Sequence, residues 1–571
     1  MHFEKLAFGD WSYVKLADEG INVLPYHLTD AAALGDKITS FWQPKYAAGV
    51  DHLATGTRTG LESFLFSLVP TWLAYGLYKI LMFFIGGLFI FKLLHDRLNA
   101  DYVAAMLAGV AFVTFIPNEI WNKLTVLALP AAVYAIAWRA DRKGGVLFAF
   151  AAGMIYELGA QVTLSLTLLS TVFFWLYFVE RLSLRRAALL FISFAVGIVA
   201  AEIHTIWAFI ANGEYSHRSI FKVVPPAYGV FFKEWVLSVF NGHALLLGIA
   251  ALMAWAGNKG FANDGMKRNL TVLAIGAGIA LYQPAFEIFR YFVQDISPFI
   301  GGYSVPKSYD ARIWYALSAG LSLDLILRHD IAFRIFGAVR KYSVAATVFI
   351  CLALVIAGGV FADKVGRLWD MLYDENFATM YRHPDLLKLA AANKDAPPFR
   401  VATPFIISDT GYMVPTFAWA YGFETVDGYV SMYPKRYKEY WLRVLAAQQG
   451  NERHREFLGS NSMIYLYGNP TDRGPVCADG GNACPIEFEN DYDLELLSLA
   501  NVRYFISARR LKSPHLSLLP SATREALIKQ QDLRLRQRLT IKLAGGYVGS
   551  PLYIYENKMM LPRYFLTEDV K

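Results

Sequence analysis

Acidic side chains near the start of the chain are the first residues whose types could support catalysis. Asp18 and Glu19 are adjacent in KLADEGINVLPYHLTDA, Asp51 lies in AGVDHLATG, and Asp10 precedes both. A carboxylate can act as a general base, and a neighbouring carboxylate raises its pKa toward the range where a base works well. Asp18 is therefore the first candidate for a base, Asp51 the second and Asp10 the third. Solvated loop acids are the alternative interpretation.

A second group of candidates is basic. These residues lie in the first loop or in short connections between apolar runs: Arg58, Arg218, Lys222, Lys307 and Arg312. A guanidinium offers a phosphate a bidentate fork and an ammonium a point charge, so this group could hold a phosphate. Contact with ordinary lipid headgroups, or an ion pair with Asp310, is the alternative.

Polar residues also interrupt several apolar runs, where burying a charge is costly. They are Glu119, Glu157, Glu202, His204 and Glu287. Together they predict a polar cavity, with satisfaction at the headgroup boundary as the alternative. His27 and His52 could ligate a metal with Asp18 or Asp51, but no ligand spacing supports a metal site. The sequence therefore predicts no cofactor, with a divalent metal as the alternative.

The elements that must position these residues are mostly apolar. Hydrophobic residues make up 55% of the 571 positions, and runs of about 17 to 25 residues, long enough to cross a bilayer, recur between 61 and 361. They are placed at 62–91, 102–116, 121–138, 145–158, 162–180, 187–210, 231–256, 269–292, 312–328 and 343–361. The sequence predicts a polytopic helical membrane domain over 61–361, with about ten or eleven transmembrane helices.

Positive charge distinguishes alternate connections between these runs and so predicts their orientation. One set carries Lys92, Arg97, Arg139, Arg142, Lys143, Arg181, Arg185, Arg186, Lys259, Lys267, Arg268, Arg328, Arg334, Arg340 and Lys341; the other carries only Lys123, Arg218, Lys222, Lys233, Lys307 and Arg312. The first set should face the cytoplasm. Residues 1–60, the loops near 117, 159, 211–228 and 293–311, and the C-terminal domain should then be extracytoplasmic. The opening residues, MHFEKLAFGDWSYVKLA, have neither an apolar core of signal length nor a cleavage pattern that could carry the first loop across, so we expect a further transmembrane helix upstream.

From 362 to 571 the composition is that of a soluble domain, and strand-like runs alternate with helical ones, which predicts an extracytoplasmic α/β domain. Cys477 and Cys484 could close a small loop in an oxidising compartment, or remain two thiols. The net charge of +7 is explained by topology, and no nucleic-acid-binding module is visible.

Three segments carry a resemblance to a known family. They are ADEGINVLPYHL followed by FWQPKYAAGVDHLATG, then GFETVDGYVSMYPKRYKEYW, and finally LLSLANVRYFIS with YIYENKMMLPRYF. With the long first loop and the C-terminal domain, they resemble the YfhO-like bacterial membrane proteins, within the GT-C class of membrane glycosyltransferases. The missing first helix is the departure from that pattern.

The resemblance implies an extracytoplasmic glycosyltransferase of the bacterial inner membrane. Such an enzyme moves a sugar from a polyprenyl-phosphate carrier to a glycan or other cell-envelope acceptor. Asp18 falls where the family has its acidic residue, and the five cations would hold the donor phosphate. DGYVSMYPKRY would bind the acceptor or act as a lid, with simple packing as the alternative. A non-catalytic polysaccharide assembly subunit and a lipid-linked sugar transporter remain open, although no internal repeat typical of transporters is visible.

Overall fold

The computed structural model describes most, but not all, of the chain. The described residues are 4–14, 24–32, 42–51, 61–115, 123–160, 166–201, 203–217, 264–280, 289, 291–293, 311–328, 370–371, 376–405, 414–430, 432–448, 463–467, 485–530 and 533–563. The chain forms two compact units. The first combines residues 1–76, 207–222 and 367–571, and the second combines 77–206 and 223–366.

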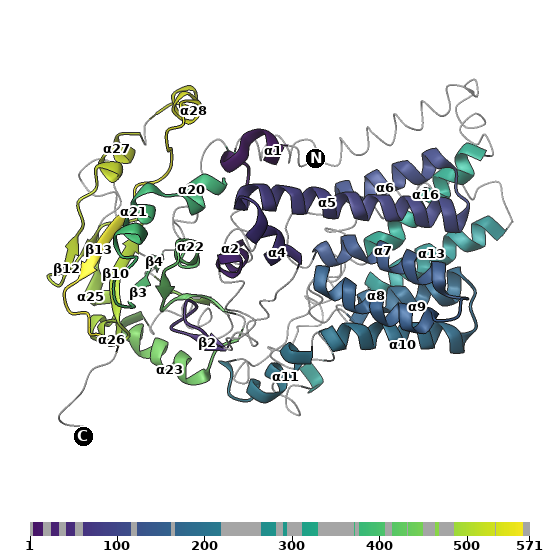
Figure 1. Ribbon diagram of the computed structural model, residues 1–571, viewed down its shortest axis with the longest axis horizontal. Coiled ribbons are helices and arrows are strands. Elements are labelled where there is room, and N and C mark those ends of the chain that lie inside the picture. Colours follow the sequence, from purple (N-terminus) through teal and green to yellow (C-terminus); the bar gives the residue numbers. More distant parts are fainter. Residues whose placement is uncertain are drawn as a thin grey trace. The chain divides into compact units, whose positions relative to one another are not determined.

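The second unit is helical (Figure 1). Its helices, with those that cross its boundaries, are α5 (Thr71–Lys92, continued by a π-turn over Leu93–Arg97), α6 (Tyr102–Phe115), α7 (Lys123–Arg139), α8 (Gly145–Ala160), α9 (Leu166–Phe174, continued by a π-turn over Trp175–Val179), α10 (Leu184–Ala201), α11 (Ile203–Asn212), α13 (Asp264–Ala280) and α16 (Ala311–Arg328). Several of these bounds follow the apolar runs closely, because a buried or lipid-facing helix needs a continuous apolar stretch of its own length.

Two helices, Thr71–Arg97 and Leu184–Ala201, are long and apolar enough to cross a membrane among the described residues. Shorter apolar helices cover Tyr102–Thr114, Val126–Arg139, Gly145–Glu157 and Leu169–Val179. These helices fit insertion into a membrane. The number of crossings stays a prediction, since the runs at 231–256 and 343–361 lie outside the described residues.

The first apolar run, expected as one helix over 62–91, is two helices. The shorter one is α4 (Leu61–Leu68), and α5 begins after Pro70. Proline has no N–H to donate, so it cannot continue the hydrogen-bond ladder of the preceding turn. The backbone oxygen of Pro70 instead accepts from the N–H groups of Leu73 and Ala74, which starts the new helix.

Glycines allow helices of this unit to approach closely. A Cβ at Gly153 of α8 would lie 2.1 Å from the backbone oxygen of Phe194 in α10, and one at Gly197 of α10 would lie 2.1 Å from that of Phe150. Small residues at such positions bring backbones together, which is typical of membrane helix pairs. Helix α16 is buried along almost its whole length.

The first unit is a mixed α/β structure built on a five-stranded sheet. Its strand order is β12–β13–β10–β3–β5, with β12 Leu516–Leu518, β13 Tyr553–Asn557, β10 Val502–Ser507, β3 Arg400–Ala402 and β5 Glu424–Thr425. Strands β10, β3 and β5 are parallel, while β13 is antiparallel to both β10 and β12. Strand β5 is thus an edge of this sheet, which leaves its outer backbone groups to be satisfied elsewhere.

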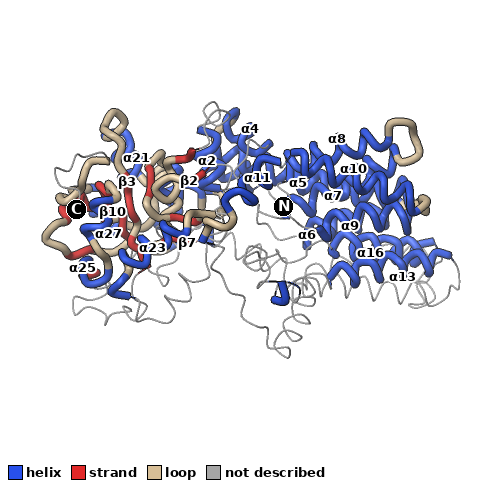
Figure 2. The backbone as a smooth tube through the Cα atoms, turned by 90° about the horizontal axis from the view of Figure 1, so that it is seen from below, coloured by secondary structure: helices blue, strands red, loops and turns tan. Residues whose placement is uncertain are grey.

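Short strand pairs and helices surround this sheet (Figure 2). The parallel pairs are β4 (Pro404–Phe405) with β8 (Leu466–Tyr467) and β9 (Ile486–Glu487) with β11 (Leu511–Lys512); β6 (Gly428–Tyr429) and β7 (Met463–Ile464) are antiparallel. The helices are α20 (Phe377–Tyr381), α21 (Pro384–Ala392), α22 (Phe417–Ala420), α23 (Lys435–Val444), α25 (Phe488–Asp491), α26 (Leu494–Leu499), α27 (Ala522–Gln530) and α28 (Leu535–Leu543).

Segments from the start of the chain belong to this same unit. They include α1 (Glu4–Phe8), α2 (Leu24–Ala32) and the antiparallel pair β1 (Trp42–Gln43) and β2 (Val50–Asp51). Residues 213–217 also join it, through the hydrogen bond from His217 N to Tyr433 O. Three regions that the charge pattern assigns to one side of a membrane are therefore collected into one body. Which side that is stays a prediction.

Candidate functional site

Most of the candidate residues from the sequence lie outside the described part of the chain. These are Asp18, Glu19, Arg58, Glu119, Glu202, Arg218, Lys222, Glu287 and Lys307, together with His52. For Asp51 and His204 only the backbone is described, on β2 and α11 respectively. The roles expected for all of these residues stay predictions.

Two further candidates are described, and both are buried in the helical unit: Glu157 from an apolar run, and Arg312, which we expected in a short connection but which lies within α16. Arg312, in the first turn of α16, is 3% exposed, and Glu157, near the end of α8, is 2% exposed. A charged side chain in such a position is costly unless other polar groups surround it, so polar groups or water are expected around each one.

No group of three His, Cys, Asp or Glu side chains that could hold a metal ion occurs among the described residues. His27 is buried, and its ring stacks on Phe66 with centroids 5.5 Å apart.

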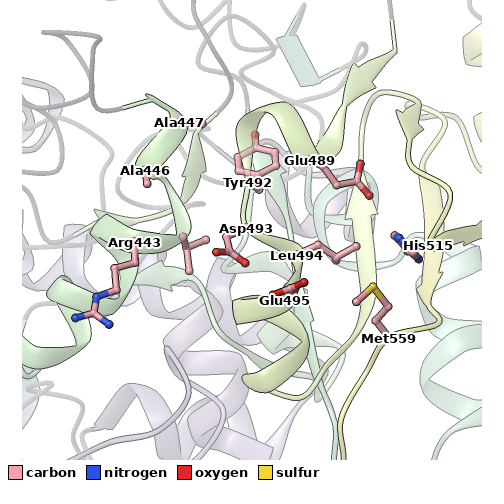
Figure 3. A pocket seen from close by; sticks show the side chains of 11 residues that line it. Arg443, Ala446, Ala447, Glu489, Tyr492, Asp493, Leu494, Glu495, His515 and Met559 are labelled. Carbon is pink, nitrogen blue, oxygen red and sulfur yellow. The ribbon is translucent and has the colours of Figure 1, made fainter.

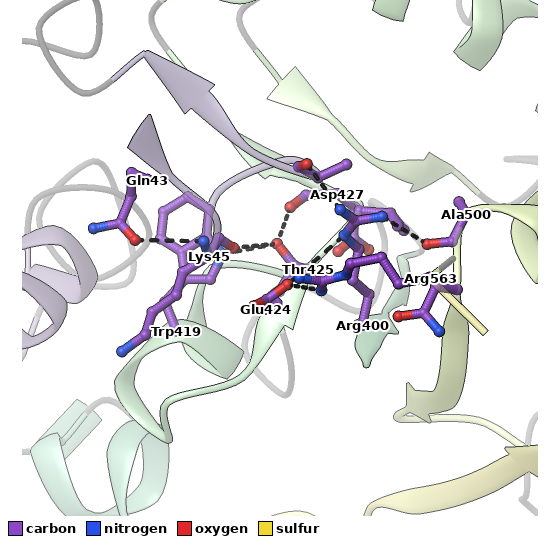
Figure 4. Close-up of polar contacts among 12 residues, drawn as sticks. Gln43, Lys45, Arg400, Trp419, Glu424, Thr425, Asp427, Ala500 and Arg563 are labelled. Atoms are coloured by element: carbon purple, nitrogen blue, oxygen red, sulfur yellow. Dashed lines mark hydrogen bonds and ion pairs between the residues drawn. The ribbon is translucent and has the colours of Figure 1, made fainter. Parts of the chain in front are cut away.

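One candidate acid, Asp51, belongs to a segment that is bound to the sheet, in what we call the loop junction: residues 42–51, 400–403 and 424–429. Between β1 and β2 the chain turns and covers the edge strand β5 (Figure 4). Thr425 N donates to Lys45 O at 3.0 Å, and Ala48 N donates to Thr425 O at 2.7 Å. Both outer backbone groups of Thr425 are therefore satisfied by the first loop, so the sheet edge is closed by a segment from the other end of the sequence.

The turn that makes these contacts has an unusual backbone. Ala47 and Ala48 have φ angles of 45° and 63°, and Gly49 follows at 108°. The left-handed region costs an L-residue with a Cβ about 1 to 2 kcal/mol of conformational free energy, whereas glycine adopts it without this penalty. Two such alanines in succession persist only where surrounding contacts hold them.

Arg400 supplies one of those contacts. Its Nη2 donates to Ala48 O at 3.0 Å, and its Nη1 donates to Ala500 O at 2.9 Å. One planar guanidinium therefore joins the strained turn to the sheet in a fixed geometry. Burial and the nearby guanidinium of Arg563 lower the pKa of Arg400.

Glu424 balances the two guanidinium groups. It accepts a hydrogen bond from Arg563 Nη2, and its carboxylate lies 3.9 Å from Arg400 Nε. The three side chains are largely buried, with exposed fractions of 16 to 22%. The arrangement keeps two like charges close together, because the carboxylate between them offsets their repulsion.

Asp427 is the acid of the Asp-Gly-Tyr segment, and it is fully buried. Its Oδ2 accepts from Thr403 N at 2.6 Å, which links the chain just after β5 to the chain just after β3. Within the described structure its Oδ1 has no hydrogen-bond partner. Burial raises the pKa of Asp427 to about 8, against a usual value of 3.8, so the group is mostly protonated at neutral pH.

Gly428 shows why a glycine follows Asp427. Its φ is 144°, and a Cβ there would lie 2.4 Å from Cζ2 of Trp419. The Trp419 ring also contacts Tyr46 and Tyr26 of the first loop, with centroids 4.4 and 5.1 Å away. Within the segment that we expected to bind an acceptor, to form a lid or simply to pack, Gly428 thus lies against a tryptophan. A role of this segment in acceptor binding stays a prediction.

Asp10, the third candidate base, is engaged elsewhere. Its Oδ2 lies 2.5 Å from Nη1 of Arg382, which follows α20. Burial raises its pKa and the cation of Arg382 opposes that shift. With Tyr13 bridged to Asn376, this ion pair makes residues 10–13 a second attachment of the first loop.

A cavity of about 380 Å³ lies elsewhere in this unit (Figure 3). It is lined by Arg443, Val444, Ala446, Ala447, Glu489, Tyr492, Asp493, Leu494, Glu495, His515 and Met559. Asp493 Oδ1 accepts from Leu496 N and so caps α26, and Glu489 accepts from Ser513 Oγ. Three carboxylates against one arginine among the lining side chains make the cavity unfavourable for an anion. The cavity is therefore a poor candidate for a lipid-phosphate site.

Comparison with solved structures finds a protein of similar fold. The chain is similar to the arabinofuranosyltransferase AftD from mycobacteria, in two classes of a mutant: the TM-scores are 0.53 and 0.50, with 13% and 14% identity. The matches cover 98% and 99% of this chain but 41% of AftD, so the chain spans less than half of that protein's length. No family model and no curated protein matches the chain.

The likeness supports the expected GT-C-like glycosyltransferase fold. It leaves the YfhO-like assignment as a prediction.

Proposed function

We propose that this chain is an extracytoplasmic glycosyltransferase of the bacterial inner membrane, which moves a sugar from a polyprenyl-phosphate carrier to a cell-envelope glycan or polymer acceptor. The observation that carries the proposal is the likeness to an arabinofuranosyltransferase over almost the whole chain, across both units. The docking of the acid-bearing first loop on the C-terminal sheet supports it, because a catalytic group needs a rigid support.

The proposed reaction is a substitution at the anomeric carbon of the donor sugar. A carboxylate, Asp18 or Asp51, takes the proton of an acceptor hydroxyl while that oxygen forms the new glycosidic bond. The bond from the anomeric carbon to the carrier phosphate breaks, and the polyprenyl phosphate leaves with the bonding electrons. Cations among Arg58, Arg218, Lys222, Lys307 and Arg312 stabilise the negative charge on that phosphate.

The test compares Asp18→Asn and Asp51→Asn in the purified full-length chain, with a polyprenyl-phosphate pentose and a polyprenyl-phosphate hexose as donors. The amide keeps the volume of the side chain but accepts no proton, so the variant of the base should lose about 10² to 10⁴ in transfer rate while still binding the carrier. Arg312→Ala should weaken carrier binding instead.

Carrier binding is measured separately, with donor lipid in detergent micelles. If the wild-type chain binds the carrier but transfers nothing, and neither Asn variant changes any property, the enzyme proposal fails. A non-catalytic assembly subunit would then explain binding without transfer. A transporter would instead move the lipid-linked sugar between the leaflets of proteoliposomes.

A further inference from the structure

The loop junction contains an arginine in the C-terminal sheet that reaches into the first loop next to a candidate base. Arg400 Nη2 donates to the carbonyl of Ala48, three residues before Asp51. Ala48 and Ala47 are both in the left-handed region. The backbone conformation of the turn that leads into β2 therefore depends on a hydrogen bond from Arg400, a residue of strand β3.

A fixed backbone at this point determines where residue 51 lies. Val50 pairs with Gln43 and Asp51 with Trp42, so the register of the hairpin is set by the turn that connects its strands. The backbone N–H and C=O of Thr425 hold that turn through hydrogen bonds with Lys45 O and Ala48 N, and the Arg400 guanidinium holds it through Ala48 O. Backbone strain of this kind gathers at functional sites, because it persists only where other contacts over-determine it.

We propose that Arg400 is a positioning residue for Asp51: through the Ala47–Ala48–Gly49 turn it fixes the backbone that presents this acid to the acceptor. The inference rests on the proposed function and assigns the role of base to Asp51 rather than Asp18. Arg400 itself need not touch the substrate, since its hydrogen bonds go to the carbonyls of Ala48 and Ala500.

The first variant is Arg400→Lys, which keeps the charge and most of the stem. A single ammonium cannot span both carbonyls with the planar geometry of the guanidinium. A displacement of about 1 Å in a reacting group costs on the order of 10²-fold in rate, so kcat should fall about 10- to 100-fold. The KM for the carrier lipid should stay within about twofold, because carrier binding does not depend on the base.

Arg503→Lys is the matched control. Arg503 lies on the neighbouring strand β10, and its hydrogen bonds go to Glu556 and Asn393 within the C-terminal domain. A general loss of stability in the sheet would affect both variants alike. Transfer by Arg503→Lys should therefore equal that of the wild type, per mole of folded protein.

Rescue and coupling test whether Arg400 acts through the turn. Glycine has no Cβ and adopts the φ of residue 48 without a clash. Adding Ala48→Gly to Arg400→Lys should therefore raise kcat at least about fivefold above that of Arg400→Lys alone. In a double-mutant cycle, adding Arg400→Lys to Asp51→Asn should cost nothing further, because the group that it positions is already gone.

Each result decides a separate claim. If Asp51→Asn abolishes transfer and Arg400→Lys behaves like Arg503→Lys, the positioning role is wrong while the enzyme stands. The same holds if Ala48→Gly gives no rescue, or if the two losses multiply in the cycle. If Asp51→Asn is active and Asp18→Asn is inactive, the base is Asp18 and the inference fails. The proposed function itself fails only if the wild-type chain transfers no sugar.

Discussion

The buried carboxyl of Asp427 should make the stability of the folded chain fall as pH rises through neutrality. Burial raises its pKa to about 8, while the unfolded chain has the usual value of 3.8. Between those values the folded state holds one proton more than the unfolded state. Stability from this group is therefore complete below pH 3.8 and is lost as pH rises toward 8.

The size of the effect follows from linkage. One extra bound proton changes the free energy of unfolding by about 1.4 kcal/mol per pH unit, or about 2 kcal/mol from pH 6.5 to pH 8. Two other buried groups limit the pH range in which this slope is seen. Burial lowers the pKa of His383 below its usual 6.5, so its contribution rises with pH and offsets the slope of Asp427 below pH 6.5. Burial lowers the pKa of Lys438 to about 8, so stability should recover between pH 8 and 10.5.

The variant that isolates the effect is Asp427→Asn. Asparagine has the shape of the protonated acid and its oxygen can accept from Thr403 N, so the variant should fold at pH 6.5. It cannot ionise, and its free energy of unfolding should not show the decline of about 2 kcal/mol up to pH 8. Asp395→Asn, which changes an exposed acid, should leave the wild-type profile intact.

The measurement is urea unfolding of the full chain in detergent, followed by tryptophan fluorescence at pH 6.5, 7.2 and 8. Trp419 packs against Gly428 and reports on this region directly. The carboxylic-acid band of Asp427 in infrared difference spectra, absent from the variant, gives an independent measure of its ionisation. A wild-type midpoint that stays constant or increases from pH 6.5 to 8, or an equal decline in Asp427→Asn, would refute the reasoning.

The remaining predictions concern glycines whose surroundings differ. In thermal unfolding, Gly428→Ala should destabilise the C-terminal sheet region by about 3 kcal/mol or more, because its Cβ would overlap Trp419 and its φ is positive. Gly422→Ala has a positive φ but open space and should cost about 1 to 2 kcal/mol, so equal losses would contradict the steric argument. Gly153→Val should weaken the contact between α8 and α10 and reduce monodisperse yield in detergent, whereas Gly278→Val, with nothing within 4 Å, should behave as wild type; a normal yield for Gly153→Val would show that the helices do not need this approach.

Hydropathy predicts much of the helical unit, since a lipid-crossing helix is recorded in local composition. The runs expected at 102–116 and 312–328 are helices Tyr102–Phe115 and Ala311–Arg328. The break at Pro70 was missed, because the apolar stretch over 62–91 is continuous in hydropathy and reads as one helix, although proline has no donor for a helix interior.

A cation between apolar runs can set membrane orientation or form an ion pair within the fold, and the sequence alone does not distinguish the two. Arg97 donates from Nε to Glu180 at 3.0 Å, and Arg328 to Asp324 at 2.7 Å. Both cations belong to the set that we expect on the cytoplasmic side. Part of the positive excess therefore has partners inside the fold, and only an account of individual side chains shows which cations are left to set orientation.

The loop junction was not predictable from spacing, because its contacts join distant positions. Arg400 reaches Ala48 across 352 positions of the chain, and no periodicity or motif connects them. The residue types of the Asp-Gly-Tyr segment were compatible with acceptor binding, a lid or simple packing. The burial of Asp427 and the contact of Gly428 with Trp419 are properties of the tertiary structure that these types do not reveal.

The first loop and the C-terminal sheet complete each other. Without the loop, the outer groups of Thr425 would leave a sheet edge open, which is a site for wrong pairing. Without the sheet, the left-handed alanines before Asp51 would lose the donors that hold them. A substitution in strand β3 or β5 can therefore change the chemistry of the first loop without touching a substrate. Under the proposed function, the C-terminal sheet is therefore part of the support for the candidate base: Thr425 exchanges hydrogen bonds with the first loop at the sheet edge, and Arg400 holds the turn before Asp51.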